Sequence, residues 1–387
     1  MKIGFVSDTD PFHDRSSWSG TVYSLCHALS QAGNEVVWVP FDKHLDSVAN
    51  RVQLRLLEWY MRLSGRLVVG TCYLDLFCRH YARAIERQGL YRECDCLFFA
   101  GPSGAQIARF LHHRVPYIYL ADACYHLMEN YYWFNLSPFF ARRARRSEEI
   151  AVKHAWFNIR SSHWAAEGTL RHCQADSRHM HVLLFGANID DHLIVPSTPY
   201  APSTSQLRIL FSGTDWERKG GDVAVETVRR LRQMGHEAEL TIVGQRSLPP
   251  SCRNLPFVHL AGFLDKNRPD DYCRYLELWQ HAHLFLLPTR AECSAIVFSE
   301  AAAYGVPVFS YDTGGTTDYV RPGINGHVLP LSDGPQQFAD AIDCCLRTHQ
   351  LPKLAAGARR LYTEALSWNQ WSRHFSEILS TEVSLLS

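Results

Sequence analysis

Two successive sets of short apolar runs alternate with amphipathic segments along this chain. The first set opens with KIGFVSD (2–8), a helical pattern between Gly20 and Gly33, and EVVWVP (35–40). Near-continuous apolar strands of this kind suit a parallel sheet that helices cover on both faces. Further strands of this set are expected at 96–100, 117–121, 156–162 and 181–186.

The pattern starts again after residues 191–206, DDHLIVPSTPYAPSTS, which are rich in Pro and Ser, lack periodicity and indicate a linker. A chain of 387 residues also exceeds what one hydrophobic core usually supports. We therefore expect two doubly wound α/β domains, with ligands bound beyond the strand ends in a cleft between them. The second set comprises strands at 207–213, 239–244, 257–262, 283–288 and 307–311, and a helix at 220–235.

Charge and cysteine content narrow the class of protein. The formal net charge is zero, whereas a nucleic-acid binder normally carries a basic excess. No apolar run reaches the ~18 residues of a membrane span, and the opening MKIGFVSD lacks the pattern of a signal peptide. The closest cysteine pairs, Cys94/Cys96 and Cys344/Cys345, lack zinc-ribbon spacing, so we expect mostly buried free thiols in a cytoplasmic protein.

Two basic segments interrupt the alternation. One reading makes residues 50–90 a helical excursion packed on the first domain; the other makes them a basic amphipathic surface for anionic lipid or a lipid-linked acceptor. The cluster ARRARR (141–146) leaves the same choice, with a solvated helix face as the simpler interpretation. The arginines that interleave with leucines and aromatics in the first segment are Arg51, Arg55, Arg62 and Arg66.

Three glycine-bearing turns lie where strands are expected to end. WSGTVYSLCHAL (18–29) leads into a helix whose N–H groups could face an anion, although a tight turn explains it equally well. FSGTDWERKGG (211–221) places Arg218 and Lys219 beside a helix start, which predicts a diphosphate site or else a solvated loop. The glycines of 311–329 allow the backbone to approach a ligand closely.

Two glutamates, Glu292 and Glu300, flank the apolar run of RAECSAIVFSE. In one continuous helix their backbones would lie ~12 Å apart, too far for a glycosidase pair around one bond. We expect Glu292 in a loop and Glu300 within a helix, each bonding a different part of an extended ligand. The N–H groups expected to hold a phosphate at the helix start are those of Ser294, Ala295 and Ile296.

These motifs resemble the retaining glycosyltransferases of family 4. The resemblance is strongest over 288–330 and 211–226, and it extends to the Ser-Gly turn at 18–25 and to 161–190. It implies the GT-B fold, in which two doubly wound Rossmann-like domains face each other across a cleft. The implied parts are an acceptor-binding domain (1–190, joined by a C-terminal helix, 369–387), the linker (191–206) and a nucleotide-sugar-binding domain (207–368).

The resemblance also assigns roles in donor binding. Glu292 would contact hydroxyls of the transferred sugar and Glu300 those of the ribose, while Lys219 with Arg218 would neutralise the leaving diphosphate. Gly20 would let the N-terminal loop close over the phosphates. The remaining donor-binding candidates are Gly213, Thr214, Phe263 and Leu264, the last two beside the base.

Other candidates lie in the N-terminal half. Asp122, which follows the strand YIYLA, would orient a sugar and act in catalysis, or else cap a helix. His13, Asp14 and His126 are candidates for the acceptor side.

Two departures from the family pattern bear on the donor. Thr214 stands where many members have Arg, and Cys293-Ser294-Ala295 replaces the usual glycines, which narrows the space near the sugar.

The implied reaction transfers a sugar from a nucleotide diphosphate sugar to the hydroxyl of a glycan, lipid-linked or small-molecule acceptor, with retention. No metal or other cofactor is expected, as the resemblance implies. The alternatives are a sugar-nucleotide epimerase or phosphorylase of the same fold, or a catalytically silent nucleotide-sugar-binding subunit. A cytoplasmic location is expected, with peripheral contact at the inner membrane face left open.

Overall fold

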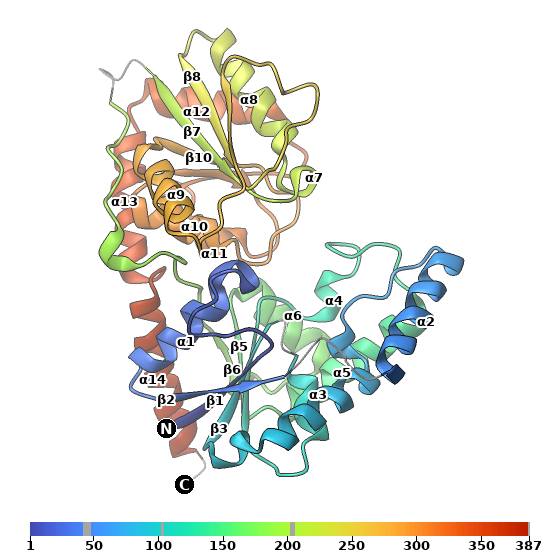
Figure 1. Ribbon diagram of the computed structural model, residues 1–387. Coiled ribbons are helices and arrows are strands. Elements are labelled where there is room, and N and C mark those ends of the chain that lie inside the picture. Colours follow the sequence, from blue (N-terminus) through green and yellow to red (C-terminus); the bar gives the residue numbers. More distant parts are fainter. Residues whose placement is uncertain (42–47, 102–103, 202–205, 386–387) are drawn as a thin grey trace. The chain divides into compact units, whose positions relative to one another are not determined.

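The computed structural model describes residues 1–41, 48–101, 104–201 and 206–385, and the chain divides into two compact units (Figure 1). Unit 1 comprises Met1–Leu183 and Ser372–Ser387, and unit 2 comprises Leu184–Trp371. The last helix thus returns the chain to unit 1, whereas the 3-10 turn Asp191–Leu193, in the expected linker, belongs to unit 2.

Unit 1 is built on a six-stranded sheet in the order β2-β1-β3-β4-β5-β6, and all its pairings are parallel. β3, β4 and β5 are buried along their whole length, which explains their unbroken apolar runs. The strands are β1 (Lys2–Ser7), β2 (Glu35–Pro40), β3 (Cys96–Ala100), β4 (Tyr117–Ala121), β5 (Phe157–Arg160) and β6 (Met180–Val182).

The strand expected at 181–186 ends at Val182 in the structure, so the prediction is wrong for the residues that follow. After that residue the chain leaves the sheet and enters unit 2, where the Phe185 N–H donates to the Tyr319 hydroxyl at 2.9 Å. An apolar run alone does not distinguish a strand from a buried crossover.

The helices of unit 1 include two from the segment that interrupts the alternation, α2 and α3. α3 buries Phe77, Tyr81 and Ile85 in the core, and α2 contributes the half-buried Leu54 and Leu57. The helices are α1 (Thr21–Gln31), α2 (Val48–Ser64), α3 (Asp75–Gln88), α4 (Tyr125–Met128), α5 (Pro138–His154), α6 (His163–Cys173) and α14 (Trp368–Ser384). Short 3-10 turns lie at Ser17–Gly20, Thr71–Tyr73, Leu90–Glu93, Ala105–Phe110 and Ser177–His179.

The C-terminal helix α14 is held on unit 1 by packing and by polar contacts. The Phe375 ring lies 6.2 Å from that of Phe98, edge to face. The buried Glu382 carboxylate contacts His179 at 2.8 Å and His181 at 2.7 Å. The end of the chain therefore completes the core of unit 1.

Unit 2 is also built on a parallel six-stranded sheet, in the order β12-β11-β10-β7-β8-β9. The strand order reverses between β7 and β10, and such a switch point leaves a crevice at the carboxyl ends of the strands. The strands are β7 (Leu207–Ser212), β8 (Ala238–Val243), β9 (Val258–Gly262), β10 (Leu284–Leu287), β11 (Val308–Tyr311) and β12 (Gly326–Leu329).

β12 was not expected, because the glycines around it indicated a ligand-binding turn. A Cβ added to Gly326 would lie 1.9 Å from the Val308 carbonyl oxygen, so this glycine lets β12 pair closely with β11. Gly326 therefore serves the sheet, and its pairing with β11 explains this glycine without a ligand.

Helices cover the sheet of unit 2 on both faces. α8 has the expected apolar spacing, buries Val225, Val228 and Leu231, and ends before Gly235. The helices are α7 (Trp216–Lys219), α8 (Gly221–Gln233), α9 (Pro269–His281), α10 (Ile296–Tyr304), α11 (Thr316–Tyr319), α12 (Pro335–Arg347) and α13 (Leu351–Glu364).

The cysteine prediction is confirmed: all twelve are free thiols and nine are buried. Within the described ranges, no helix is long and apolar enough to cross a membrane.

Candidate functional site

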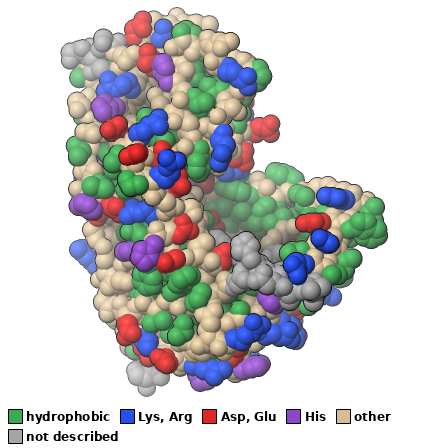
Figure 2. Space-filling view, viewed as in Figure 1, with side chains coloured by type: hydrophobic (Ala, Val, Ile, Leu, Met, Phe, Trp, Pro, Cys, Tyr) green, Lys and Arg blue, Asp and Glu red, His purple; other side chains and the backbone are tan. Residues whose placement is uncertain are grey.

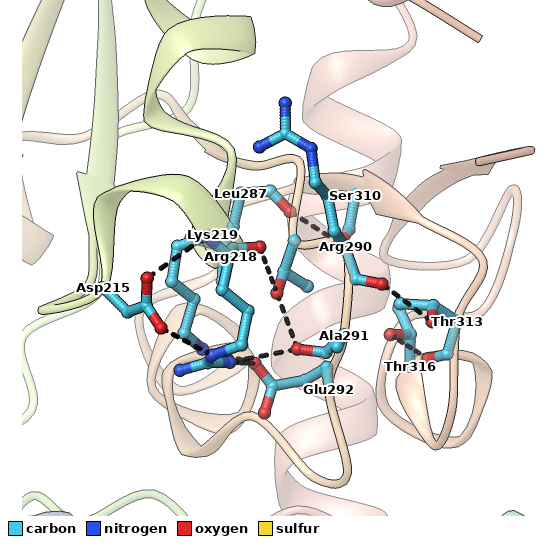
Figure 3. A network of polar contacts seen from close by, with 11 residues as sticks. Asp215, Arg218, Lys219, Leu287, Arg290, Ala291, Glu292, Ser310, Thr313 and Thr316 are labelled. Carbon is cyan, nitrogen blue, oxygen red and sulfur yellow. Dashed lines mark hydrogen bonds and ion pairs between the residues drawn. The ribbon is translucent and has the colours of Figure 1, made fainter. Parts of the chain in front are cut away.

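Three loops at the carboxyl ends of adjacent strands are hydrogen-bonded to one another in unit 2. The backbone N–H of Arg290, after β10, donates to the Arg218 carbonyl, after β7, at 2.7 Å. The N–H of Gly315, after β11, donates to the Glu292 carbonyl at 3.1 Å. Figure 3 shows Arg218, Lys219 and Glu292 of these loops lying close together.

Lys219 and Arg218 both direct their cationic groups toward the Glu292 carboxylate (Figure 3). The Lys219 ammonium forms a close ion pair with Glu292 Oε2, and Arg218 Nη1 lies 3.8 Å from the same oxygen. Arg218 also donates to the Ala291 carbonyl at 3.0 Å and contacts Asp215 at 3.2 Å. The Lys219 and Glu292 side chains are 12% and 7% exposed, so each charge depends on the other for compensation.

Local backbone chemistry explains how the sequence positions Lys219. Asp215 caps α7 by accepting from the Arg218 N–H at 3.2 Å. A Cβ at Gly213 would lie 2.9 Å from Lys219 Cγ, so the glycine leaves room for the lysine stem. Gly220 has a φ of +73°, and a Cβ there would meet the Pro288 carbonyl oxygen at 2.1 Å. Gly213 and Gly220 are therefore both required by close approach.

Glu300 is fully buried on α10, and both of its carboxylate oxygens have partners. Oε1 lies 2.6 Å from Lys266 Nζ, and Oε2 accepts from the Tyr275 hydroxyl at 2.5 Å. Lys266 also donates to the Asn188 carbonyl at 3.3 Å. Burial, and then the Glu300 charge, raises the pKa of Tyr275 well above its usual value, so this hydroxyl remains a donor.

Lys266 and Tyr275 were missed in the sequence. Lys266 lies in the loop after β9, 34 residues from Glu300, and belongs to no motif. Tyr275 carries a usable signal, because it stands four residues before the buried Trp279 on the apolar face of α9. The hydroxyl on that face indicates a buried polar partner.

The structure confirms that Glu292 lies in a loop and Glu300 within a helix. α10 begins at Ile296 after the N-cap residue Ala295, which offers no side-chain cap. Ser294 is 8% exposed, and its hydroxyl has no hydrogen-bond partner in the described part of the chain. An uncapped helix start beside a buried hydroxyl offers donors to an anion.

The remaining donor candidates follow β7 and β9 of unit 2. Phe263 and Leu264 follow β9; the Phe263 ring is half-exposed and lies under the Arg246 guanidinium at 5.4 Å. Thr214 is exposed beyond the end of β7.

In unit 1, Gly20 caps α1 with a φ of +91°, after two residues that are also left-handed, Trp18 and Ser19. A side chain at Gly101 would collide with the Trp18 ring, at 2.6 Å. Non-glycine residues at positive φ cost about 1–2 kcal/mol each, so local packing must hold this turn.

His13 and Asp14 lie in the loop between β1 and that turn. His13 is exposed and contacts Asp10 at 2.8 Å. Asp14 accepts from the N–H and the hydroxyl of Ser16 at 2.8 and 2.6 Å. Both side chains thus bond within their own loop.

Asp122 follows β4 at the carboxyl end of the sheet and is not a helix cap, because the N-cap of α4 is Cys124. His126 lies on α4, and its ring stacks on that of His172 at 4.7 Å. Burial, and then His172, lowers the pKa of His126, which favours the neutral ring. The unit 1 candidates thus lie in the loop after β1 (His13 and Asp14), directly after β4 (Asp122) and on α4 (His126).

No group of three or more His, Cys, Asp or Glu side chains able to hold a metal ion occurs among the described residues.

Comparison with known proteins places this geometry in a class. Sucrose-phosphate synthase from Thermosynechococcus elongatus aligns over 100% of both chains, with a TM-score of 0.69 and 16% identity. HepE of Anabaena, solved in complex with UDP-glucose, aligns over 98% of this chain and 100% of its own, with a TM-score of 0.64 and 17% identity. The fold is GT-B, as predicted.

Sequence comparison adds the family. Residues 206–348, somewhat more than a third of the chain, match the family described as "Glycosyl transferases group 1". The D-inositol 3-phosphate glycosyltransferase of Xylanimonas cellulosilytica is 29% identical over 233 residues, 55% of this chain. The amylovoran biosynthesis glycosyltransferase AmsK of Erwinia amylovora is 30% identical over 140 residues, 33% of each chain. The first match spans 54% of the Xylanimonas protein, about half the length of that relative.

Proposed function

We propose that this protein is a retaining glycosyltransferase, which transfers a sugar from a nucleotide diphosphate sugar to an acceptor hydroxyl without a metal ion. The observation that carries this proposal is the buried Lys219–Glu292 pair beside the uncapped start of α10, at the switch point of unit 2. The segment that holds it, 206–348, matches the glycosyltransferase family. HepE of Anabaena, with the same fold, binds UDP-glucose.

The two charges of the pair match the two ends of the bond to be broken. An ammonium stabilises the charge that develops on the departing diphosphate, and a carboxylate accepts hydrogen bonds from sugar hydroxyls. Donor binding would replace the Lys219–Glu292 contact by one contact to each half of the donor. Arg218 and the first N–H groups of α10 supply further positive character for the phosphates.

Two parts of the proposal rest on the family resemblance. Retention follows from that resemblance, and so does the assignment of Glu300 to the ribose. Metal independence has a local reason, because Lys219 and Arg218 bring positive charge to the place where a divalent cation would act. The acceptor is a glycan, a lipid-linked molecule or a small molecule.

The test is binding and sugar transfer by the full chain with UDP-, GDP- and ADP-sugars in excess EDTA. We expect one nucleotide class to bind in the micromolar to millimolar range and to release its sugar. Lys219→Ala should lower turnover by about 10²–10³, the usual cost of losing a charge-stabilising donor. Lys353→Ala, an exposed lysine on α13, is the matched control and should retain wild-type turnover.

Three results would contradict the proposal in different ways. Failure to bind any sugar nucleotide would exclude the proposed glycosyltransferase activity. Binding with no turnover would support a catalytically silent binding subunit. If Lys219→Ala changes neither the affinity for the donor nor the rate of transfer, the assignment of the donor site to Lys219 and Glu292 is excluded. The anomeric configuration of the product, read by NMR, tests retention separately.

A further inference from the structure

An apolar groove opens on unit 1 between α2, α3 and α5, the helices that interrupt the strand–helix alternation. Its volume is about 930 Å³, within the range of sites that hold small molecules. Nine of its sixteen described lining residues are aliphatic or aromatic. The apolar lining residues are Leu56, Leu57, Tyr60, Leu74, Leu76, Phe77, Phe139, Phe140 and Ile150.

Five arginines surround this apolar lining: Arg79, Arg109, Arg142, Arg143 and Arg146. Asp75 is the single acid that lines the groove, and it is already paired with Arg109. A groove with an apolar floor and a cationic rim is complementary to a molecule with an apolar body and an anionic head.

Three of these arginines have no acidic partner among the described residues. Arg79 and Arg143 lie over the rings of Phe110 and Phe139, at 4.9 and 4.7 Å. Arg142 is exposed and enters no described hydrogen bond or ion pair. Their charges therefore remain available to an anion at the rim.

The basic rim continues past one end of the groove. A second cavity of about 440 Å³ shares Arg109 and Ile150 with the first, and it adds Arg114 and His154 to the lining. Together the two cavities form an elongated depression rather than a compact pocket.

The apolar surface also continues outward along α2. Leu56, Trp59 and Leu63 lie on its exposed side, and Trp59 and Leu63 are 62% and 67% exposed. Figure 2 shows hydrophobic and basic side chains together where Figure 1 places α2. An exposed tryptophan beside leucines and arginines is typical of helices that lie in a membrane interface.

We propose that the groove holds one hydrocarbon chain of an anionic membrane lipid, while Arg142 and Arg143 bind its phosphate. The exposed leucines of α2 favour a bilayer over a protein helix as occupant, because a helix lying in the groove would leave them uncovered. This proposal does not depend on the sugar-transfer reaction.

The test is co-sedimentation of the full chain with phosphatidylcholine vesicles, with and without about 30 mol% phosphatidylglycerol. We expect the chain to bind the anionic vesicles and to be released at high salt. Arg142→Ala/Arg143→Ala should weaken binding by about tenfold or more, since each arginine near a charged surface contributes about fivefold. Arg83→Ala/Arg87→Ala, an equal charge change at exposed α3 positions outside the lining, should change it less than threefold.

A second pair of variants separates the groove from the outer face of α2. Leu76→Gln, which makes the groove lining polar, should weaken vesicle binding by about tenfold. Leu63→Gln changes a 67% exposed leucine outside the lining, which would touch only the surface of the bilayer, and should weaken binding by only about threefold. Equal losses would overturn the proposal, because the lipid would then contact the helix face and not the groove.

Three other outcomes also overturn it. Equal binding to neutral and anionic vesicles would show that the arginines do not bind a lipid phosphate. Displacement by millimolar inorganic phosphate would indicate an anion site without a chain. Self-association that Leu76→Gln abolishes, seen by sedimentation velocity, would make a second copy of this protein the occupant.

Discussion

The loops that follow the strands are bonded to one another in unit 2, whereas in unit 1 the His13 side chain bonds a residue of its own loop. In unit 2, the backbone hydrogen bond from Arg290 to Arg218 ties the loop after β10 to the loop after β7. In unit 1, the contact from His13 to Asp10 spans three residues of one loop. Unit 2 thus holds its charged groups in place through several strands at once, which is the preorganisation that electrostatic catalysis needs.

The two units also differ in how they compensate a fully buried carboxylate. Glu300 of unit 2 is paired with the ammonium of Lys266 at 2.6 Å. Glu148 of unit 1 accepts from the Tyr119 hydroxyl at 3.3 Å and the Tyr125 N–H at 2.5 Å. Burial raises the pKa of Glu148 to about 8, so the carboxyl is mainly neutral at pH 7. Unit 2 therefore buries an ionised carboxylate paired with a cation, whereas unit 1 buries a carboxyl group that keeps its proton.

Removing the cation beside Glu300 should have the largest effect on stability. Lys266→Met leaves the Glu300 charge uncompensated, which typically costs about 3–5 kcal/mol. The double variant Lys266→Met/Glu300→Gln removes both charges and should recover most of that loss. Urea-induced unfolding measures each free energy. If the single and double variants are equally destabilised, Lys266 does not compensate Glu300.

The second-largest loss of stability is expected at Gly220, because the unit 2 loops are in close contact there. Gly220→Ala combines a positive φ with a Cβ 2.1 Å from the Pro288 carbonyl oxygen, and it should cost about 3 kcal/mol. Gly235→Ala is the matched control: its φ is +96° but nothing lies within 4 Å of the added Cβ, so about 1 kcal/mol is expected. Equal losses, measured by urea unfolding, would mean that the two loops are not in close contact.

Most strands of both units could be predicted from the sequence. Apolar runs bounded by glycines located ten strands, because a buried parallel strand has few other ways to appear in sequence. β12 escaped because four residues after a glycine turn carry too short a pattern. β6 was overextended because the crossover into unit 2 is apolar too.

At the candidate site, the residues that could be picked out from the sequence are those that stand in local motifs. Lys219 and Glu292 each follow a recognisable strand and glycine turn, and the sheet order brings them together. Lys266 follows no such pattern, and its partnership with Glu300 depends on how the loop after β9 lies against α10. Charge partners set by loop packing leave no trace in periodicity.

The neutral state of Glu148 predicts a pH dependence for unit 1. The unfolded chain ionises this carboxyl near its usual pKa, while the folded chain keeps its proton up to about pH 8. The folded state therefore binds more protons in that window, so stability is full below the unfolded pKa and falls as pH rises, by up to about 1.4 kcal/mol per unit.

Glu148→Gln should remove this dependence, which amounts to about 2 kcal/mol between pH 5 and pH 7. Urea unfolding of both proteins across this range measures the difference. Cys124, Tyr119 and Arg160 also act on the carboxyl, and the contact with Cys173 lowers the pKa of the Cys124 thiol, so Cys124→Ala serves as the control. A slope that persists in Glu148→Gln but vanishes in Cys124→Ala would assign the titration to the thiol.

The smallest effect is expected at the exposed ion pair that also links the unit 2 loops. Arg290 bonds both carboxylate oxygens of Asp222, at 3.1 and 2.9 Å, but the two side chains are 43% and 58% exposed. Solvent screens such a pair, so Asp222→Asn should cost less than about 1 kcal/mol, and less still in 1 M salt. A cost that matches Gly220→Ala and is insensitive to salt would show that the loops depend on this charge pair. A small, salt-sensitive cost means that close backbone packing at Gly220 holds them, and that the surface charges only add to it.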